Sequence, residues 1–157
     1  MASTITAATL TVTLTESVTL NGSDQGATNT LSIASVNEVS KRIVTATTTE
    51  RIILVFGSNI AAGQFDKTKA VYVRITNLDD TNHVGLIFRN LVGDEFSVKL
   101  DKGQSFIYNG DLAGGVVDTM DAVDAAGLTT NTFADLVDIT ADADTASVDL
   151  EVFVASS

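Results

Sequence analysis

The side chain best suited to proton transfer near neutral pH in this sequence is its single histidine, His83. A Ser-His-Asp triad would need this histidine as its base, and a zinc site would need several more histidine or cysteine ligands. Its neighbours Asn82 and Val84 place it beside a turn, at the start of an expected strand, where a histidine needs no catalytic role. The sequence therefore predicts no catalytic residues, no zinc site and no enzyme activity.

Carboxylates are the remaining side chains that could bind a metal ion, because calcium takes clustered carboxylate and carbonyl oxygens. Two groups are closely spaced: Asp138, Asp142 and Asp144, and Asp118, Asp121 and Asp124. Neither group has the spacing or the terminal glutamate of an EF-hand loop. Charged loops that face water give the same pattern, so a weak calcium site stays an alternative to the main prediction of no metal and no cofactor.

One segment approximates the glycine spacing of a phosphate-binding loop. Residues 57–64 begin with Gly57 and contain Gly63, but the segment lacks the lysine that reaches the phosphates and has one residue too many between the glycines. We interpret it as a connection between strands.

The charge of the chain is unevenly distributed. Its net charge is −11, and all nine lysines and arginines lie between Lys41 and Lys102. An acidic surface repels phosphate backbones, so nucleic acid is not expected as a partner. The acidic parts are interpreted as a solvated surface, or alternatively as a face for a basic partner.

Several functional classes are disfavoured by composition and hydropathy. Cysteine is absent, which excludes a small disulfide scaffold. No apolar run approaches the roughly 20 residues that span a bilayer, and Met1–Leu10 lacks the basic and apolar blocks of a signal peptide. We expect no contact with a membrane.

The elements that would position any site are strands, since 50 of the 157 residues are the β-branched Thr, Val or Ile. Apolar and polar residues alternate in most of the expected strands, which lie near residues 9–15, 31–33, 43–46, 51–56, 71–75, 84–88, 96–100, 106–108, 136–139 and 148–154. The consecutive apolar residues of 52–56 predict a central strand buried on both faces. Residues 71–108 are predicted to form a four-strand antiparallel meander, and Asn21-Gly22 a tight turn.

These strands predict a single domain over residues 1–157, an antiparallel β-sandwich or jelly-roll-like barrel of about eight to ten strands. Residues 1–8 form an N-terminal arm without charge, and residues 109–134 a long acidic loop region. The strand at Thr9–Thr15 has one face of hydroxyls, and the chain has no proline to blunt a sheet edge. We therefore predict a homo-oligomer, with residues 1–8 at a subunit or capsid contact.

The segment Val71–Asn82, followed by an apolar strand and by Gly103-Gln104-Ser105-Phe106, resembles a strand–turn passage of small virion proteins of tailed bacteriophages, particularly marine and cyanobacterial ones. The resemblance covers roughly residues 43–108. It implies a capsid decoration protein, assembled in the host cytoplasm and located in the virion, with the major capsid protein as a partner and a trimer as the oligomer.

Two alternatives stay open at this point. The first is a tail or head–tail component of a phage. The second is a carbohydrate-binding β-sandwich, although the chain has no tryptophan and only Tyr72 and Tyr108 to stack on sugar rings. A hydrolase with a dispersed acidic site is a third possibility, although no specific residue pattern supports it.

Overall fold

The computed structural model describes residues 4–59, 61–91, 93–109 and 136–157. These residues form thirteen strands and no helix. The described part of the chain accordingly has no helix that could cross a membrane.

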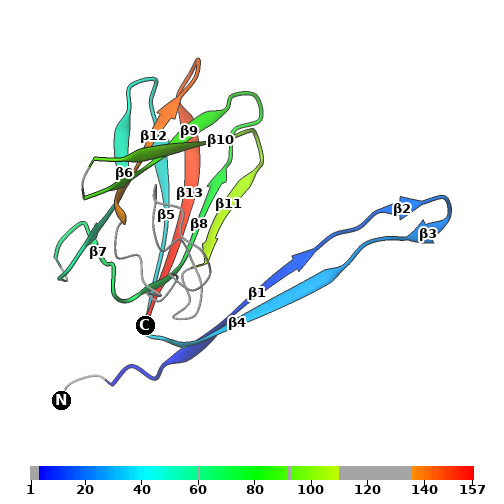
Figure 1. Cartoon of the computed structure of the whole chain (residues 1–157), viewed down its shortest axis with the longest axis horizontal. Helices are drawn as coiled ribbons and strands as arrows, with labels where there is room; N and C mark the ends of the chain where they lie inside the picture. The colour runs from blue at the N-terminus through cyan, green and yellow to red at the C-terminus, as the bar shows by residue number, and fades with distance from the viewer. Residues whose placement is uncertain (1–3, 60, 92, 110–135) are drawn as a thin grey trace.

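Nine of the strands form two facing sheets (Figure 1). The five-stranded sheet has the order β10 (Glu95–Leu100), β9 (Val84–Asn90), β12 (Leu136–Ala143), β6 (Arg51–Gly57) and β7 (Phe65–Asp66). The four-stranded sheet has the order β11 (Ser105–Asn109), β8 (Ala70–Asn77), β13 (Val148–Ser156) and β5 (Glu38–Ala46). All neighbouring strands are antiparallel except β6 and β7. The prediction of an antiparallel β-sandwich is confirmed.

The core lies between these two sheets because each strand turns alternate side chains inward. Along β13 the inward residues Val148, Leu150, Val152 and Val154 are at most 1% exposed. Phe88 of β9 is fully buried and stacks on Phe96 of β10, with ring centroids 4.6 Å apart. Its ring also lies 5.0 Å from that of Phe106 on β11, so one aromatic side chain links the two sheets.

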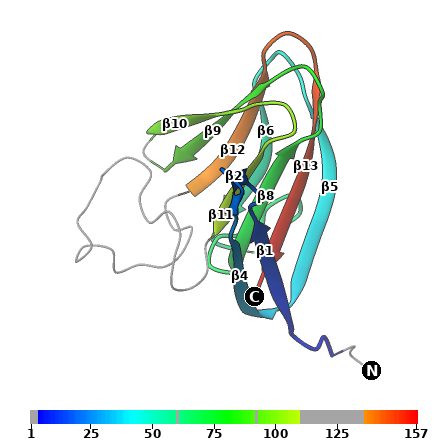
Figure 2. The same ribbon diagram turned by 90° about the vertical axis from the view of Figure 1, so that its right-hand side faces the viewer.

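The remaining strands form a projecting arm (Figures 1 and 2). β1 (Ala8–Thr15) pairs with β4 (Thr28–Val36), and the tip contains β2 (Thr19–Leu20) and β3 (Ser23–Asp24). The predicted turn at Asn21-Gly22 is confirmed, because both residues have positive φ, 51° and 81°. This is the backbone that a two-residue hairpin turn requires, and glycine and asparagine tolerate it best.

The predicted meander over residues 71–108 is wrong. β8 pairs with β11 and β13, whereas β9 pairs with β10 and β12 in the opposite sheet. The turn after β8 therefore carries the chain from one sheet to the other. Alternation located the strands correctly, but it could not show that both edges of β8 are occupied by strands from farther along the chain.

The prediction that the strand at 51–56 is central and buried on both faces is confirmed only in part, because β6 has a neighbour on each side but is not buried along its whole length. The most central strand of that sheet is β12, and beyond β6 lies only the two-residue β7. Ile52 is 55% exposed, whereas Ile53, Leu54 and Phe56 are buried. An unbroken apolar run does not reveal which of its residues face water.

Candidate functional site

His83 lies in the turn before β9, 3.6 Å from a carboxylate oxygen of Asp144 through its Nδ1 atom. Both side chains are partly exposed, at 35% and 52%. In a triad the histidine also accepts a hydrogen bond from a nucleophilic hydroxyl, whereas the contact found for the His83 side chain among the described residues is with Asp144. The pair fits a surface contact between the turn and the loop after β12.

The structure separates the three calcium candidates Asp138, Asp142 and Asp144. Asp142 lies exposed on β12, and Asp144 beside His83. Asp138 faces Arg89 instead, with 3.8 Å between its Oδ1 and Nη1 of the arginine. No group of three or more His, Cys, Asp or Glu is placed to hold a metal ion within the described ranges. The second candidate group, Asp118, Asp121 and Asp124, lies outside the described residues, as does most of the acidic region 109–134.

Asp138 is the most buried of these carboxylates, and burial raises its pKa while the guanidinium of Arg89 opposes that rise. Arg89 also forms ion pairs with Glu50 and Glu95. The negative charges of these two glutamates raise the pKa of Asp138 further. The cluster is an ion-pair network on the outer side of the five-stranded sheet.

In the segment at 57–64, the side chain of Gln64 contacts the backbone of Gly57 and Asn59. The Gln64 amide lies against Gly57, where an added Cβ would come within 2.6 Å of it, and donates to the backbone oxygen of Asn59 at 2.6 Å. A phosphate-binding loop would leave its backbone N–H groups open to an anion. The segment joins β6 to β7, which agrees with its interpretation as a connection.

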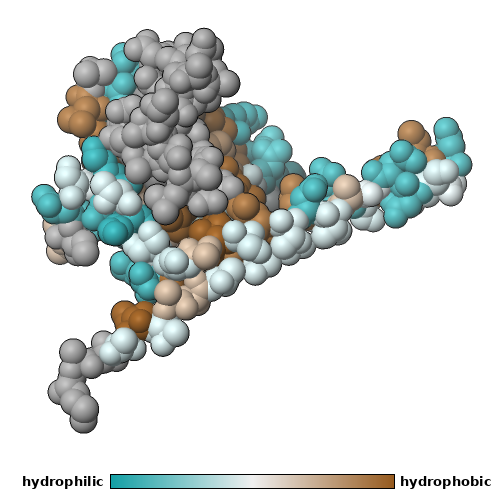
Figure 3. All heavy atoms as spheres, turned by 60° about the horizontal axis from the view of Figure 1, so that its bottom comes forward, coloured by the Kyte–Doolittle hydropathy of each residue, from teal (hydrophilic) through white to brown (hydrophobic). Residues whose placement is uncertain are grey.

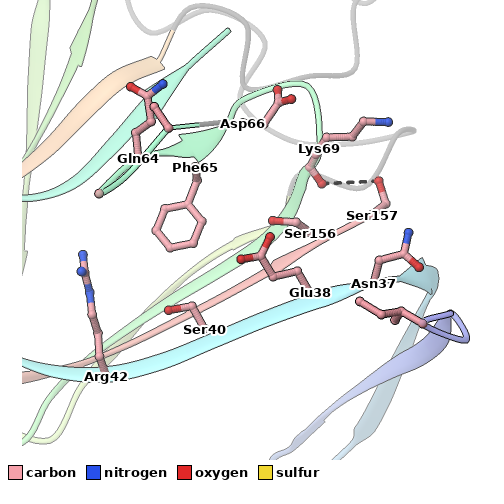
Figure 4. A pocket seen from close by; sticks show the side chains of 13 residues that line it. Asn37, Glu38, Ser40, Arg42, Gln64, Phe65, Asp66, Lys69, Ser156 and Ser157 are labelled. Carbon is pink, nitrogen blue, oxygen red and sulfur yellow. Dashed lines mark hydrogen bonds between the residues drawn. The ribbon is translucent and has the colours of Figure 1, made fainter. Parts of the chain in front are cut away.

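A cavity of about 760 Å³ lies between β5 and β7 (Figure 4). β5 contributes Glu38, Ser40 and Arg42, which occupy the positions that face inward on this edge strand. Phe65 of β7 lies opposite, and Ile5 borders the cavity from the start of the arm.

The polar groups of this cavity are held mainly by the protein itself. Arg42 donates from Nη2 to the backbone oxygen of Ile53 at 2.6 Å. Asp66 accepts hydrogen bonds from the side chain and backbone of Thr68, which hold its pKa below the ordinary value. Inward-pointing charges on an edge strand discourage pairing with stray strands. The lining of the cavity thus combines charged, hydroxyl and aromatic side chains.

The arm has two chemically different faces, because residues opposite each other in a ladder point to the same side. One face contains hydroxyl residues in pairs, with Thr11 opposite Ser32, Thr13 opposite Thr30, and Thr15 opposite Thr28. The other face contains the apolar pairs Leu10–Ile33 and Val12–Leu31.

The root of the arm packs its apolar face on the outer side of the four-stranded sheet. A second hydrophobic cluster joins Ile33 and Val36 of β4 to Val71, Tyr72 and Ala155. Figure 3 shows hydrophobic atoms where the arm leaves the sandwich, and mostly pale and hydrophilic atoms along the arm itself. Tyr72 and Phe153 meet edge to face there, with centroids 5.9 Å apart.

An ion-pair network lies beside this root. Arg74 donates from Nη2 to Glu151 at 2.5 Å, and Lys41 lies 2.9 Å from the other oxygen of the same carboxylate. The hydrogen bond from Arg74, followed by that from Lys41, holds the pKa of Glu151 below its ordinary value near 4.5. Arg74 also lies 6.0 Å from the ring centroid of Phe153.

Replacing this carboxylate tests the network. We expect Glu151→Gln to lower the free energy of unfolding at pH 7 by about 1–2 kcal/mol, because two charged hydrogen bonds become weaker. A lowered pKa stabilises the fold above the unfolded-state value near 4.5 and loses that effect as the pH falls through the folded-state value. The difference between variant and native chain in urea titrations should therefore shrink below about pH 4.5. A difference that stays constant to lower pH would contradict the assigned pKa direction.

The fold and these surfaces define the class of the protein as an antiparallel β-sandwich with a projecting two-stranded arm. A comparison with models of known protein families finds none that matches the chain. A comparison with curated proteins finds no match either.

Sequence reasoning missed the length of the arm and the cavity. The arm was expected over residues 1–8, whereas the projecting element extends through Val36. The low charge of this part of the sequence could have indicated the longer arm, because the charged residues of 4–36 are only Glu16 and Asp24. The cavity had no such signal, because its walls come from strands that meet only in the folded chain.

Proposed function

We propose that the chain is a structural protein of a bacteriophage virion, one that decorates and stabilises the capsid. The single observation that carries the proposal from the structure is the arm. It extends away from the sandwich, is nearly free of charge, and leaves apolar residues such as Leu14 and Leu20 54% and 62% exposed. An element of this kind is suited to attachment, because its burial against another protein removes apolar surface from water at little cost in desolvated charge.

The resemblance of Val71–Asn82 and of Gly103–Phe106 to small virion proteins of tailed phages supports the same proposal. In the structure these segments supply β8 and its following turn, and the turn that leads into β11. They are therefore structural parts of the sandwich, and the proposal assigns no catalytic role to them. The major capsid protein is the proposed partner of the assembled protein in the virion.

The test is quantitative mass spectrometry of purified virions from the phage that encodes the chain. We expect a copy number in fixed proportion to that of the major capsid protein, and release of the chain to lower the temperature at which capsids break. A few copies per particle would instead favour the tail or head–tail alternative. Absence from virions combined with saturable polysaccharide binding would replace the proposal with the carbohydrate-binding alternative.

A further inference from the structure

The tip of the arm contains an asparagine followed by a glycine, and both residues are exposed to water. Asn21 and Gly22 form the turn between β2 and β3, at the end of the arm farthest from the sandwich (Figure 1). A Cβ added to Gly22 would meet no other atom within 4 Å. Neighbouring side chains therefore do not shield the backbone that follows Asn21.

Few contacts hold this turn closed. The strands β2 and β3 are joined by two ladder pairs, Thr19–Asp24 and Leu20–Ser23. Leu20 is 62% exposed, so the pairs gain little from burial. Two strands alone are marginally stable in water, and local opening costs least where few apolar contacts protect the backbone. The turn should accordingly open more readily than the sheets of the sandwich.

We infer that Asn21 is a site of spontaneous deamidation in the free chain, with water as the co-reactant. When the turn opens, the backbone nitrogen of Gly22 attacks Cγ of the Asn21 side chain. A bond forms between this nitrogen and Cγ, the bond from Cγ to Nδ2 breaks, and ammonia leaves with the proton of the Gly22 nitrogen. The product is a cyclic succinimide. Water then opens the ring at either of its carbonyl groups and gives aspartate or isoaspartate.

The residue after the asparagine makes Asn21 more reactive than the other exposed asparagine of β4. The attacking nitrogen belongs to that next residue, and glycine has no Cβ that would hinder its approach or restrict its backbone. Asn29 is followed by the β-branched Thr30 and lies opposite Leu14 in the longer ladder of the arm. Both differences slow the attack, so Asn29 serves as an internal control.

Either product changes the tip of the arm. Both add a negative charge to an element whose charged residues between positions 4 and 36 are Glu16 and Asp24. Isoaspartate also routes the backbone through Cβ and Cγ of residue 21, which lengthens the two-residue turn that sets the Leu20–Ser23 pairing. A charge buried against another protein is costly, so deamidation would weaken the attachment of the arm. This consequence rests on the proposed function, whereas the modification itself does not.

Mass spectrometry of the purified full-length chain, sampled during incubation at mildly alkaline pH, tests the inference. Fragmentation of peptides locates each exchange of an amide for a carboxyl group, and it separates Asn21 from Asn109, which also precedes a glycine in the sequence. We expect the rate at Asn21 to exceed that at Asn29 at least about tenfold, because glycine leaves the approach free. The rate should rise with pH, since the attacking nitrogen must lose its proton, and isoaspartate should accompany aspartate.

A reversible cross-link tests whether the turn must open. Residues 19 and 24 face each other in the ladder, so Thr19→Cys with Asp24→Cys should form a disulfide, and the chain has no native cysteine to compete. Once mass spectrometry has verified the disulfide, the oxidised variant should deamidate at Asn21 at least about tenfold more slowly than the same variant after reduction. The reduced form is the matched control, because it has the same sequence.

Three results would overturn the inference: equal rates at Asn21 and Asn29, aspartate without isoaspartate at residue 21, or equal rates in the oxidised and reduced variant. A chain that deamidates at Asn21 but is absent from virions would overturn the proposed function and leave this inference standing. A chain that is present in virions but keeps its Asn21 amide when free in solution would do the reverse.

Discussion

Replacing Phe88 with alanine should lower the free energy of unfolding by about 3–5 kcal/mol, the usual cost of truncating a buried phenylalanine. The side chain is fully buried and touches Phe96 in its own sheet and Phe106 in the facing one. Its loss would remove apolar contacts and leave a cavity between the two sheets. Since small domains are stable by only about 5–15 kcal/mol, much of the chain should be unfolded at moderate temperature.

Urea titration followed by circular dichroism measures this effect. The matched variant is Phe96→Ala, which removes the same group from a half-buried ring at the edge of the same cluster. We expect it to cost clearly less than Phe88→Ala. Equal costs for the two substitutions would mean that Phe88 does not link the two sheets as the packing indicates.

The second large effect is expected at Asn77, a fully buried amide at the end of β8. Its Nδ2 donates to the backbone oxygens of Asn82 and Leu100, at 2.9 and 3.3 Å, and its Oδ1 accepts from the Asp79 backbone at 2.8 Å. Asn77→Asp keeps the shape but replaces the donors with a charge that faces two carbonyl oxygens. We expect a loss of about 3 kcal/mol or more at neutral pH.

The pH dependence of that loss follows from linkage. Burial beside two carbonyls raises the pKa of the introduced carboxyl group, so its penalty is largest at high pH and decreases as the pH falls and the group becomes a donor again. Asn29→Asp makes the same chemical change at an exposed position of the arm and should alter stability by less than about 0.5 kcal/mol. A small, pH-independent loss for Asn77→Asp would show that the amide does not hold this turn.

Asn77 also lies at the turn that carries the chain from one sheet to the other. The turn 77–82 is held by Asp79, which accepts from the backbones of Thr81 and Asn82 at 2.7 and 2.6 Å. These hydrogen bonds hold the pKa of Asp79 below its ordinary value. The polar residues thus form the predicted turn. In addition, the amide of Asn77 donates a hydrogen bond to the end of β10 in the other sheet.

Several features of the structure depend only on residues that are close together in the chain, and the sequence alone predicts them. The Asn21-Gly22 turn depends only on the two residues that adopt positive φ, and the hydroxyl and apolar faces of the arm depend only on a two-residue period. The all-β class likewise follows from β-branched composition and alternation. These signals act between neighbours in the chain, so a sequence contains them in full.

The tertiary structure alone decided which strands pair, where the arm points and where the cavity opens. β13 lies between β5 and β8, and these three strands are separated in sequence by loops and by other strands. Such pairings depend on the total apolar surface that a particular arrangement buries, and the two-residue period of each strand fits many partners equally well. For that reason the sequence identified Val71–Ile75 and Arg51–Phe56 as strands, while only the folded chain showed β8 enclosed in one sheet and Ile52 of β6 facing water.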